Sequence, residues 1–338
     1  MAAPTLPPAG AALGDALRQI VALQSQRLRQ HDSGTRRGED PEALHSMRVA
    51  VRRLRAAVRI FAVAIPIRQR EAFRRELHWL GESLGGVRDL DVQLVALRTY
   101  RASLSPAQRG GLAWLEPHVR RERTRRRGAM LVALDSRRYA ILLTRLERFA
   151  TGPRGPAQPA AAHDLLATAG RRILGRGAKR LLQRGNAIAA GDHDVTPEDL
   201  HALRIRAKRV RYLLEFLREL TGKPGRRLVK RLIRLQDLLG AHQDAVVATA
   251  FLHQATSAAP MESAGLLALG AYTEHQRQRA ANARTEFRRA WCRFARKRTL
   301  EDLRALLRRL KALSRANPAP PAMPSADAAA LPRDRTGV

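Results

Sequence analysis

Arginine side chains recur at helical spacing in the segment LHSMRVAVRRLRAAVRIF, which runs from residue 44 to residue 61. A guanidinium group is planar, keeps its charge at physiological pH and binds phosphate oxygens through two parallel hydrogen bonds. On a helix with about 100° per residue, the apolar residues of this segment form one stripe. A second stripe beside it, the first ladder, consists of His45, Arg48, Arg52, Arg55 and Arg59.

The charges of the first ladder all have the same sign, and Arg53 points to the opposite side of the helix. A solvent-exposed helical face normally mixes signs and places Glu four residues before Lys. Like charges at this spacing repel each other, so the ladder is tolerated best when an anion lies against it. The pattern therefore favours an anion-binding surface over an ordinary solvated face.

The same pattern occurs a second time, because PEALHSMRVAVRRLRAAVRIF (41–61) aligns without gaps with PEDLHALRIRAKRVRYLLEFL (197–217). In this copy Arg209 matches Arg53, and Glu215 replaces Arg59. The segments that follow also match, with Gly85 aligned to Gly240, and we expect both glycines at helix C-termini. The second ladder consists of His201, Arg204, Lys208 and Arg211.

Further cations follow each ladder on the next expected helix. In the first copy they are Arg70, Arg74, Arg75 and His78. In the second copy they are Arg227, Lys230, Arg231 and Arg234. Because these helices would pack antiparallel to the ladder helices, we expect their cations to widen the same groove.

Nearly every long segment has the helical period, and no segment alternates convincingly as a strand would. Helices are expected at 12–31, 41–65, 67–84, 88–103, 106–134 and 136–150, then at 163–190, 197–220, 225–240, 242–258, 262–297 and 299–314. The prediction is an all-α duplicated helical bundle. Its parts are a flexible N-terminus (1–11), a first half (12–150), a Gly/Pro-rich linker (151–162), a second half (163–314) and a disordered tail (315–338).

The composition restricts the kinds of partner. The net charge of the 338 residues is +33, which favours polyanions such as nucleic acid, anionic membrane or polyphosphate. Aromatic residues make up only 4%, whereas proteins that bind single strands usually stack bases on aromatic rings. No apolar run approaches the length of a membrane span, and no secretory signal is expected. With one cysteine, no internal disulfide is expected either. We therefore expect a cytoplasmic protein.

Catalytic and metal sites are not expected. His45 and His201 are either structural histidines or added donors near a helix N-terminus, where backbone N–H groups favour anions. Asp89 and its counterpart Asp244 could form an acid–base pair, but each is better explained as pinning a neighbouring arginine or capping a helix. The sequence contains no glycine-rich phosphate loop, nucleophile arrangement or metal-ligand cluster, so no cofactor is expected.

The two repeats resemble the CHAD domain, the "conserved histidine α-helical domain". The resemblance is carried by the paired His-x-x-Arg-x-x-x-(Arg/Lys)-Arg pattern and by LGGVRDLDVQL and LQDLLGAHQDAVVA, and it covers roughly residues 12–312. It implies two similar four-helix bundles with extra short helices, related by a pseudo-twofold axis. It also implies binding of inorganic polyphosphate on a basic surface or cavity, in association with polyphosphate granules.

In this resemblance the first-copy motif positions are His45, Arg48, Arg52, Arg53 and Arg55, and the second-copy positions are His201, Arg204, Lys208, Arg209 and Arg211. Non-catalytic polyphosphate binding is the leading hypothesis for the chain. The alternative is an RNA- or DNA-binding protein that uses the phosphate backbone, which the scarcity of aromatic residues weakens. Nothing resembles the Glu-x-Glu-x-Lys strand of the triphosphatase domains sometimes fused to CHAD modules, so hydrolysis is not carried over.

Overall fold

The computed structural model describes residues 8, 10–152, 158–191, 195–256 and 262–317. Every regular element in these ranges is a helix, and the only strand-like pairing there is an isolated antiparallel bridge between Ala12 and Leu165. The all-α prediction is confirmed. The predicted N-terminal segment and tail lie largely outside the described residues, as do residues 153–157 of the predicted linker. The pseudo-twofold arrangement of bundles stays a prediction.

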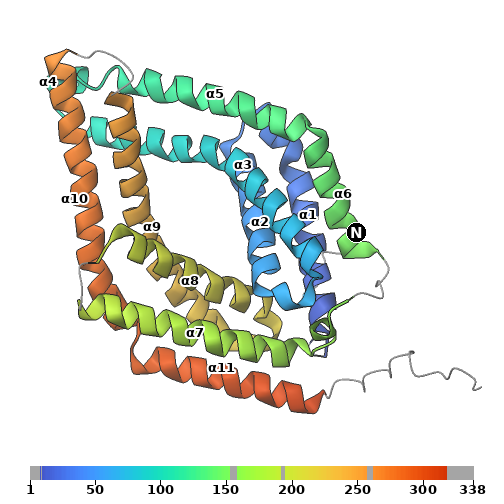
Figure 1. Cartoon of the computed structure of the whole chain (residues 1–338). Helices are drawn as coiled ribbons and strands as arrows, with labels where there is room; N and C mark the ends of the chain where they lie inside the picture. Colours follow the sequence, from blue (N-terminus) through green and yellow to red (C-terminus); the bar gives the residue numbers. More distant parts are fainter. Residues whose placement is uncertain (1–7, 9, 153–157, 192–194, 257–261, 318–338) are drawn as a thin grey trace, which may run out of the picture.

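The helices of the first half are α1 (Leu13–Arg37), α2 (Pro41–Ile60), η1 (Ala62–Ala64), α3 (Ile67–Ala102), α4 (Pro106–Gly110), α5 (Leu115–Asp135) and α6 (Arg137–Thr151). Those that follow are η2 (Ala160–Ala162), α7 (Leu166–Ala190), α8 (Pro197–Phe216), α9 (Arg218–Thr256), α10 (Ser263–Phe294) and α11 (Lys297–Ala316). Together they form a four-sided frame (Figure 1). No helix of the described part is long and apolar enough to cross a membrane.

The ladder helices α2 and α8 begin in the same way. Pro41 and Pro197 each occupy the first turn, where a missing N–H group costs nothing. The Asp40 side chain accepts a hydrogen bond from the backbone N–H of Glu42, and α8 has a capping box between Thr196 and Asp199. These caps fix where each ladder starts, so the two ladders have the same register on their helices.

The expectation that Gly85 and Gly240 end helices is wrong, because both lie inside the long helices α3 and α9. The backbone of α9 leaves helical geometry only near its start, at Gly222, where φ is 58°. A Cβ atom at Gly240 would lie 3.4 Å from Nη2 of Arg204. The bare backbone at Gly240 thus lets a ladder arginine approach α9 closely.

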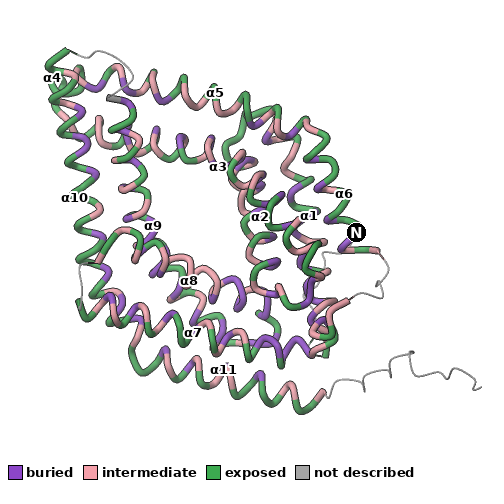
Figure 2. The backbone as a smooth tube through the Cα atoms, viewed as in Figure 1, coloured by how far each residue is buried: buried purple, intermediate pink, exposed green. Residues whose placement is uncertain are grey.

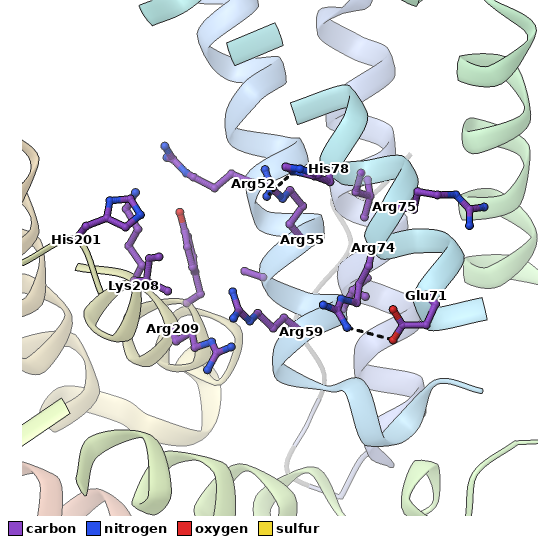
Figure 3. Close-up of a pocket in the computed structure, with 15 residues that line it drawn as sticks. Arg52, Arg55, Arg59, Glu71, Arg74, Arg75, His78, His201, Lys208 and Arg209 are labelled. Atoms are coloured by element: carbon purple, nitrogen blue, oxygen red, sulfur yellow. Dashed lines mark hydrogen bonds and ion pairs between the residues drawn. The ribbon is translucent and has the colours of Figure 1, made fainter. Parts of the chain in front are cut away.

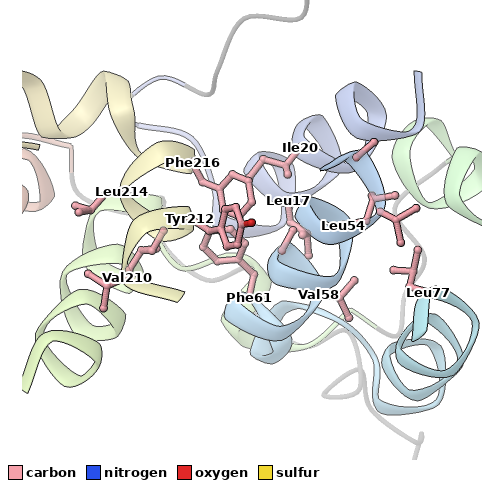
Figure 4. Packing of buried hydrophobic residues seen from close by; sticks show 14 of the residues in the cluster. Leu17, Ile20, Leu54, Val58, Phe61, Leu77, Val210, Tyr212, Leu214 and Phe216 are labelled. Atoms are coloured by element: carbon pink, nitrogen blue, oxygen red, sulfur yellow. The ribbon is translucent and has the colours of Figure 1, made fainter. Parts of the chain in front are cut away.

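One hydrophobic core runs through both halves, and its buried stripes follow the packed faces of the helices (Figure 2). Between α2 and α8 the rings of Phe61 and Phe216 lie 5.9 Å apart, with Ile20 of α1 and Tyr212 of α8 beside them (Figure 4). A second, smaller buried cluster joins the far ends of α3 and α5 to α9 and α10. The halves therefore meet at two separate places, which holds α2 and α8 in a defined relation.

Candidate polyanion-binding site

A basic pocket of about 700 Å³ lies between α2, α3 and α8. The cations and histidines that line it come from both halves of the chain: Arg52, Arg55, Arg59, Arg74, Arg75, His78, His201, Lys208 and Arg209. Glu71 is the only carboxylate among its lining residues. Seven formally cationic side chains thus face one acid, and such a pocket attracts anions.

The first ladder contributes its exposed members to the pocket. Arg52 and Arg59 point from α2 across to α8, where Lys208 and Arg209 lie (Figure 3). Within the described part of the chain neither Arg52 nor Arg59 is paired with a carboxylate, and Arg55 contacts only the ring Nδ1 of His78, at 3.3 Å. These guanidinium groups remain available to a ligand.

The second ladder is more deeply enclosed than the first. Burial is the main cause that lowers the pKa of Lys208 to about 7, and the nearby charges of Arg204, Arg52 and Arg211 contribute to the same shift. The pKa of Arg204 is lowered for the same main reason, with Asp244 partly offsetting the effect of burial. A half-buried cation without a close partner is costly, so Lys208, which lines the pocket, gains when an anion enters. Arg204 lines none of the described pockets.

Three buried polar atoms beside the ladders have no hydrogen-bond partner among the described residues. They are Nε of Arg204, Nε of Arg209 and the hydroxyl of Tyr212. Arg209 and Tyr212 line the pocket itself. Tyr212 is not among the site residues predicted from the sequence, because it belongs to the largely apolar run YLLEFL. Its spacing of four residues from Lys208, which places it beside the ladder, is the signal that could have found it. Unpaired buried donors next to a basic pocket are groups that a phosphate oxygen could satisfy.

Some predicted site residues make contacts outside the pocket. The Arg48 Nη1 donates to the carbonyl of Gly85 at 2.8 Å and lies 3.1 Å from Oδ1 of Asp89. This pairing agrees with the expectation that Asp89 pins an arginine. His45 is half-buried and does not line the pocket, and burial lowers its pKa. Its counterpart His201 lines the pocket, with Nδ1 2.6 Å from Oε1 of Gln243.

Arg53 and Arg211 are tied together by Glu215. The carboxylate accepts a hydrogen bond from Arg53 at 2.8 Å and another from Arg211 at 2.7 Å, and Arg211 also donates to Gln236. Glu215 is the residue that replaces Arg59 in the second copy. The acid at this position therefore creates an ion pair that joins the two halves. Neither Arg53 nor Arg211 lines the pocket.

The cations predicted on α9 lie elsewhere. Arg227 and Arg231 pair with Asp302 of α11, and Arg231 and Arg234 line a separate hollow against α10. Lys230 is exposed and lines none of the described pockets. Only the equivalent helix of the first half, α3, widens the groove as expected. The reason is visible in the alignment, where Arg74 and His78 of α3 match the apolar Val229 and Ile233 of α9.

The described residues contain no group of three or more His, Cys, Asp or Glu side chains that could hold a metal ion. The acid closest to the pocket, Glu71, already accepts hydrogen bonds from Arg70 and Arg74. What the arrangement offers is a set of cations around an open hollow, which suits an anion with many oxygens.

The family model of the CHAD domain matches residues 19–253, which is most of the chain. The chain therefore belongs to the CHAD domain family. The crystal structure of the CHAD domain from the plant Ricinus communis aligns with a TM-score of 0.59 and 30% identity, covering 90% of this chain and 94% of that one. PptA from Streptomyces chartreusis has the same fold, with a TM-score of 0.67 and 23% identity over 83% of this chain and 99% of that chain.

Two curated relatives also match, both uncharacterized proteins of Mycobacterium tuberculosis. Rv2226 of strain H37Rv and MT2285 of strain CDC 1551 are each 29% identical over 258 residues, or 72% of this chain. The chain spans about half the length of these relatives, since the match covers 46% of each.

Proposed function

We propose that this chain binds inorganic polyphosphate in the basic pocket, without catalysing a reaction on it. The observation that carries the proposal is the convergence of cations from both repeats, Arg52 and Arg59 on α2 and Lys208 and Arg209 on α8, on one hollow of about 700 Å³. Membership of the CHAD family supports the same ligand class.

The chemistry of the lining favours a polymer of phosphates. Each guanidinium can bind two oxygens, and each neutralised phosphate releases condensed counterions, a rule framed for nucleic acids that extends to any dense polyanion. Apart from the histidines, Tyr212 is the only aromatic residue among the described residues that line the pocket. Its ring is buried and offers no platform for a base. A ligand without bases or sugars is the simplest match.

The proposed role is that of a binding module at polyphosphate granules in the cytoplasm. Absence of turnover is part of the proposal, and it is tested by incubating the pure protein with polyphosphate and a divalent metal. Sustained release of phosphate would contradict it.

A competition experiment tests the ligand. Long-chain polyphosphate, single-stranded RNA and duplex DNA are compared at equal phosphate concentration and physiological salt. We expect polyphosphate to displace both nucleic acids, with an affinity that falls steeply as salt increases. If RNA or DNA binds as tightly, the alternative of a protein for nucleic acid backbones replaces the proposal.

A further inference from the structure

A second basic hollow adjoins the pocket on its α7 side. It has a volume of about 240 Å³ and lies between α2, η1, α7 and α8. Its cations are Arg59, Arg172, Arg176, Arg180 and Arg209, and we call it the α7 groove. The remaining lining is mainly apolar, including Ile60, Val63 and Leu213.

The α7 groove and the pocket share two residues. Arg59 of α2 and Arg209 of α8 line both hollows, so they stand at the boundary between them. Figure 3 shows these two side chains close together at the end of the pocket where α2 and α8 approach each other. A ligand that reaches Arg59 and Arg209 from the pocket is therefore already in contact with the wall of the α7 groove.

The arginines of α7 form a third ladder of one sign. Arg172, Arg176 and Arg180 follow one another at steps of four, which places them along one side of the helix. All three are exposed, and only Arg172 has an acidic partner in the described ranges, Asp164 at 3.2 Å. Arg176 and Arg180 have no carboxylate there to neutralise them.

Like charges crowd at the shared boundary. The pKa of Arg209 is lowered first by burial and then by the charges of Arg59, Arg180 and Arg206. Its Nε is buried and has no hydrogen-bond partner among the described residues. An unpaired buried donor at the junction of two basic hollows is an independent sign that an anion passes this point.

We infer that the α7 groove is a second binding segment, through which a long phosphate chain held in the pocket continues between Arg59 and Arg209 and out along Arg176 and Arg180. This inference rests on the proposed function. The contact on α7 would be intramolecular once the pocket is occupied, so it adds affinity only for chains long enough to reach both segments.

The test compares two double variants with equal loss of charge. Arg176→Gln/Arg180→Gln removes the two arginines of the third ladder that have no acidic partner in the described ranges, and Arg304→Gln/Arg308→Gln is the control. The control arginines lie on α11 at the same spacing of four, are exposed and line none of the described pockets. Exposed substitutions of this kind change stability by only about 0.5 kcal/mol, so both variants should fold, and circular dichroism and thermal unfolding check this.

Each protein is titrated with tripolyphosphate and with long-chain polyphosphate over a series of salt concentrations. We expect the affinity of the α7 variant for long chains to fall about tenfold. This loss corresponds to one weak charge contact removed at each arginine. Its salt dependence for long chains should have a log–log slope smaller by about two, or about one per lost phosphate contact. Its affinity for tripolyphosphate and both affinities of the control should stay close to wild type.

The outcomes separate the two proposals. Equal long-chain affinity in the α7 variant and the control overturns the α7 segment and leaves the pocket intact. The same loss for short and long chains also overturns it, because the α7 arginines would then act on the pocket through their general field. If wild type binds neither ligand, the proposed function fails and the α7 segment fails with it.

Discussion

The two ladders come from the same sequence pattern but have different environments. On α2, Arg52, Arg55 and Arg59 are exposed, and none of them pairs with a carboxylate in the described residues. On α8, Lys208 is half-buried and Arg211 is bound to Glu215 and Gln236. Arg52, Arg55 and Arg59 of the first ladder thus keep their charge available, and only Arg48 pairs with an acid, Asp89, among the described residues. In the second ladder, Arg211 is held in contacts that stabilise the fold.

Single substitutions between the copies account for this difference. Gln236, which accepts from Arg211, corresponds to Gly81 in the first copy, where a Cβ atom would lie 2.8 Å from Nη1 of Arg55. Glu215 corresponds to Arg59. The duplicated helix has therefore kept its shape in both copies while its polar partners changed.

The largest effect should come from removing exposed cations of the first ladder. Arg52→Gln/Arg59→Gln deletes two unpaired guanidinium groups that face α8 across the pocket. Charge-assisted hydrogen bonds contribute roughly 1.5 kcal/mol each, so the expected loss of polyphosphate affinity is about a hundredfold. Isothermal titration calorimetry measures it, with Arg304→Gln/Arg308→Gln as the control of equal charge. Equal losses in both proteins would mean that net charge alone governs binding.

The next effect concerns Glu215, the acid of α8 that pairs with Arg53 of α2 and with Arg211. Glu215→Gln leaves Arg53 and Arg211 half-buried without a carboxylate. We expect the free energy of unfolding to fall by roughly 2 kcal/mol, less than for a fully buried pair because all three groups retain some exposure. Polyphosphate affinity should rise slightly, since the site gains net positive charge.

The matched control is Glu71→Gln, which removes the pocket's own carboxylate. Glu71 is exposed and pairs with exposed Arg74, so its loss should change stability by less than about 1 kcal/mol. Urea denaturation distinguishes the variants. If both lose the same stability, Glu215 is an ordinary surface acid and the contrast between the ladders is wrong.

A smaller effect is expected from pH. Because the pKa of Lys208 is about 7 in the folded protein, against an ordinary value of 10.5, the lysine loses its proton as pH rises from about 6 to 8. Polyphosphate affinity should then fall by about fivefold, which corresponds to the loss of one weak charge contact. The Lys208→Arg variant keeps its charge, so its polyphosphate affinity should change less with pH over this range. Terminal phosphates also titrate near pH 6, but they affect both proteins equally.

The lowered pKa of Lys208 also affects how the free energy of unfolding depends on pH. Between about pH 7 and 10.5 the unfolded chain binds a proton at Lys208 that the folded protein lacks, so this group makes the free energy of unfolding rise with pH. Identical pH profiles of binding for wild type and Lys208→Arg would assign the titration to another group.

The smallest effect concerns Tyr212, whose hydroxyl is buried and unpaired among the described residues. Tyr212→Phe removes this donor while keeping the ring that stacks with Phe216. Stability should stay the same or rise slightly, because an unsatisfied hydroxyl is lost. Polyphosphate affinity should fall about threefold, which corresponds to the loss of one neutral hydrogen bond. Unchanged affinity, measured by calorimetry, would show that the hydroxyl does not reach the ligand.

The sequence by itself determined the helical class, the duplication and the two ladders. The helical period places Arg52 and Arg59 on one side of a helix wherever that helix packs, because the local backbone geometry alone sets the direction in which each side chain leaves the helix. The step-of-four arginines Arg172, Arg176 and Arg180 carried the same kind of signal and could have been found in this way.

Only the tertiary structure decided which cations share a pocket. Arg53 and Glu215 are 162 residues apart, and the α9 arginines meet Asp302 more than 70 residues further on, so no local pattern could assign these partners. Gly85 and Gly240 read as helix ends because a glycine's conformational freedom is visible in sequence, whereas the arginine approaching it is not. Helix faces follow from the spacing of residues along the chain, but the partner of each charge depends on how the helices pack.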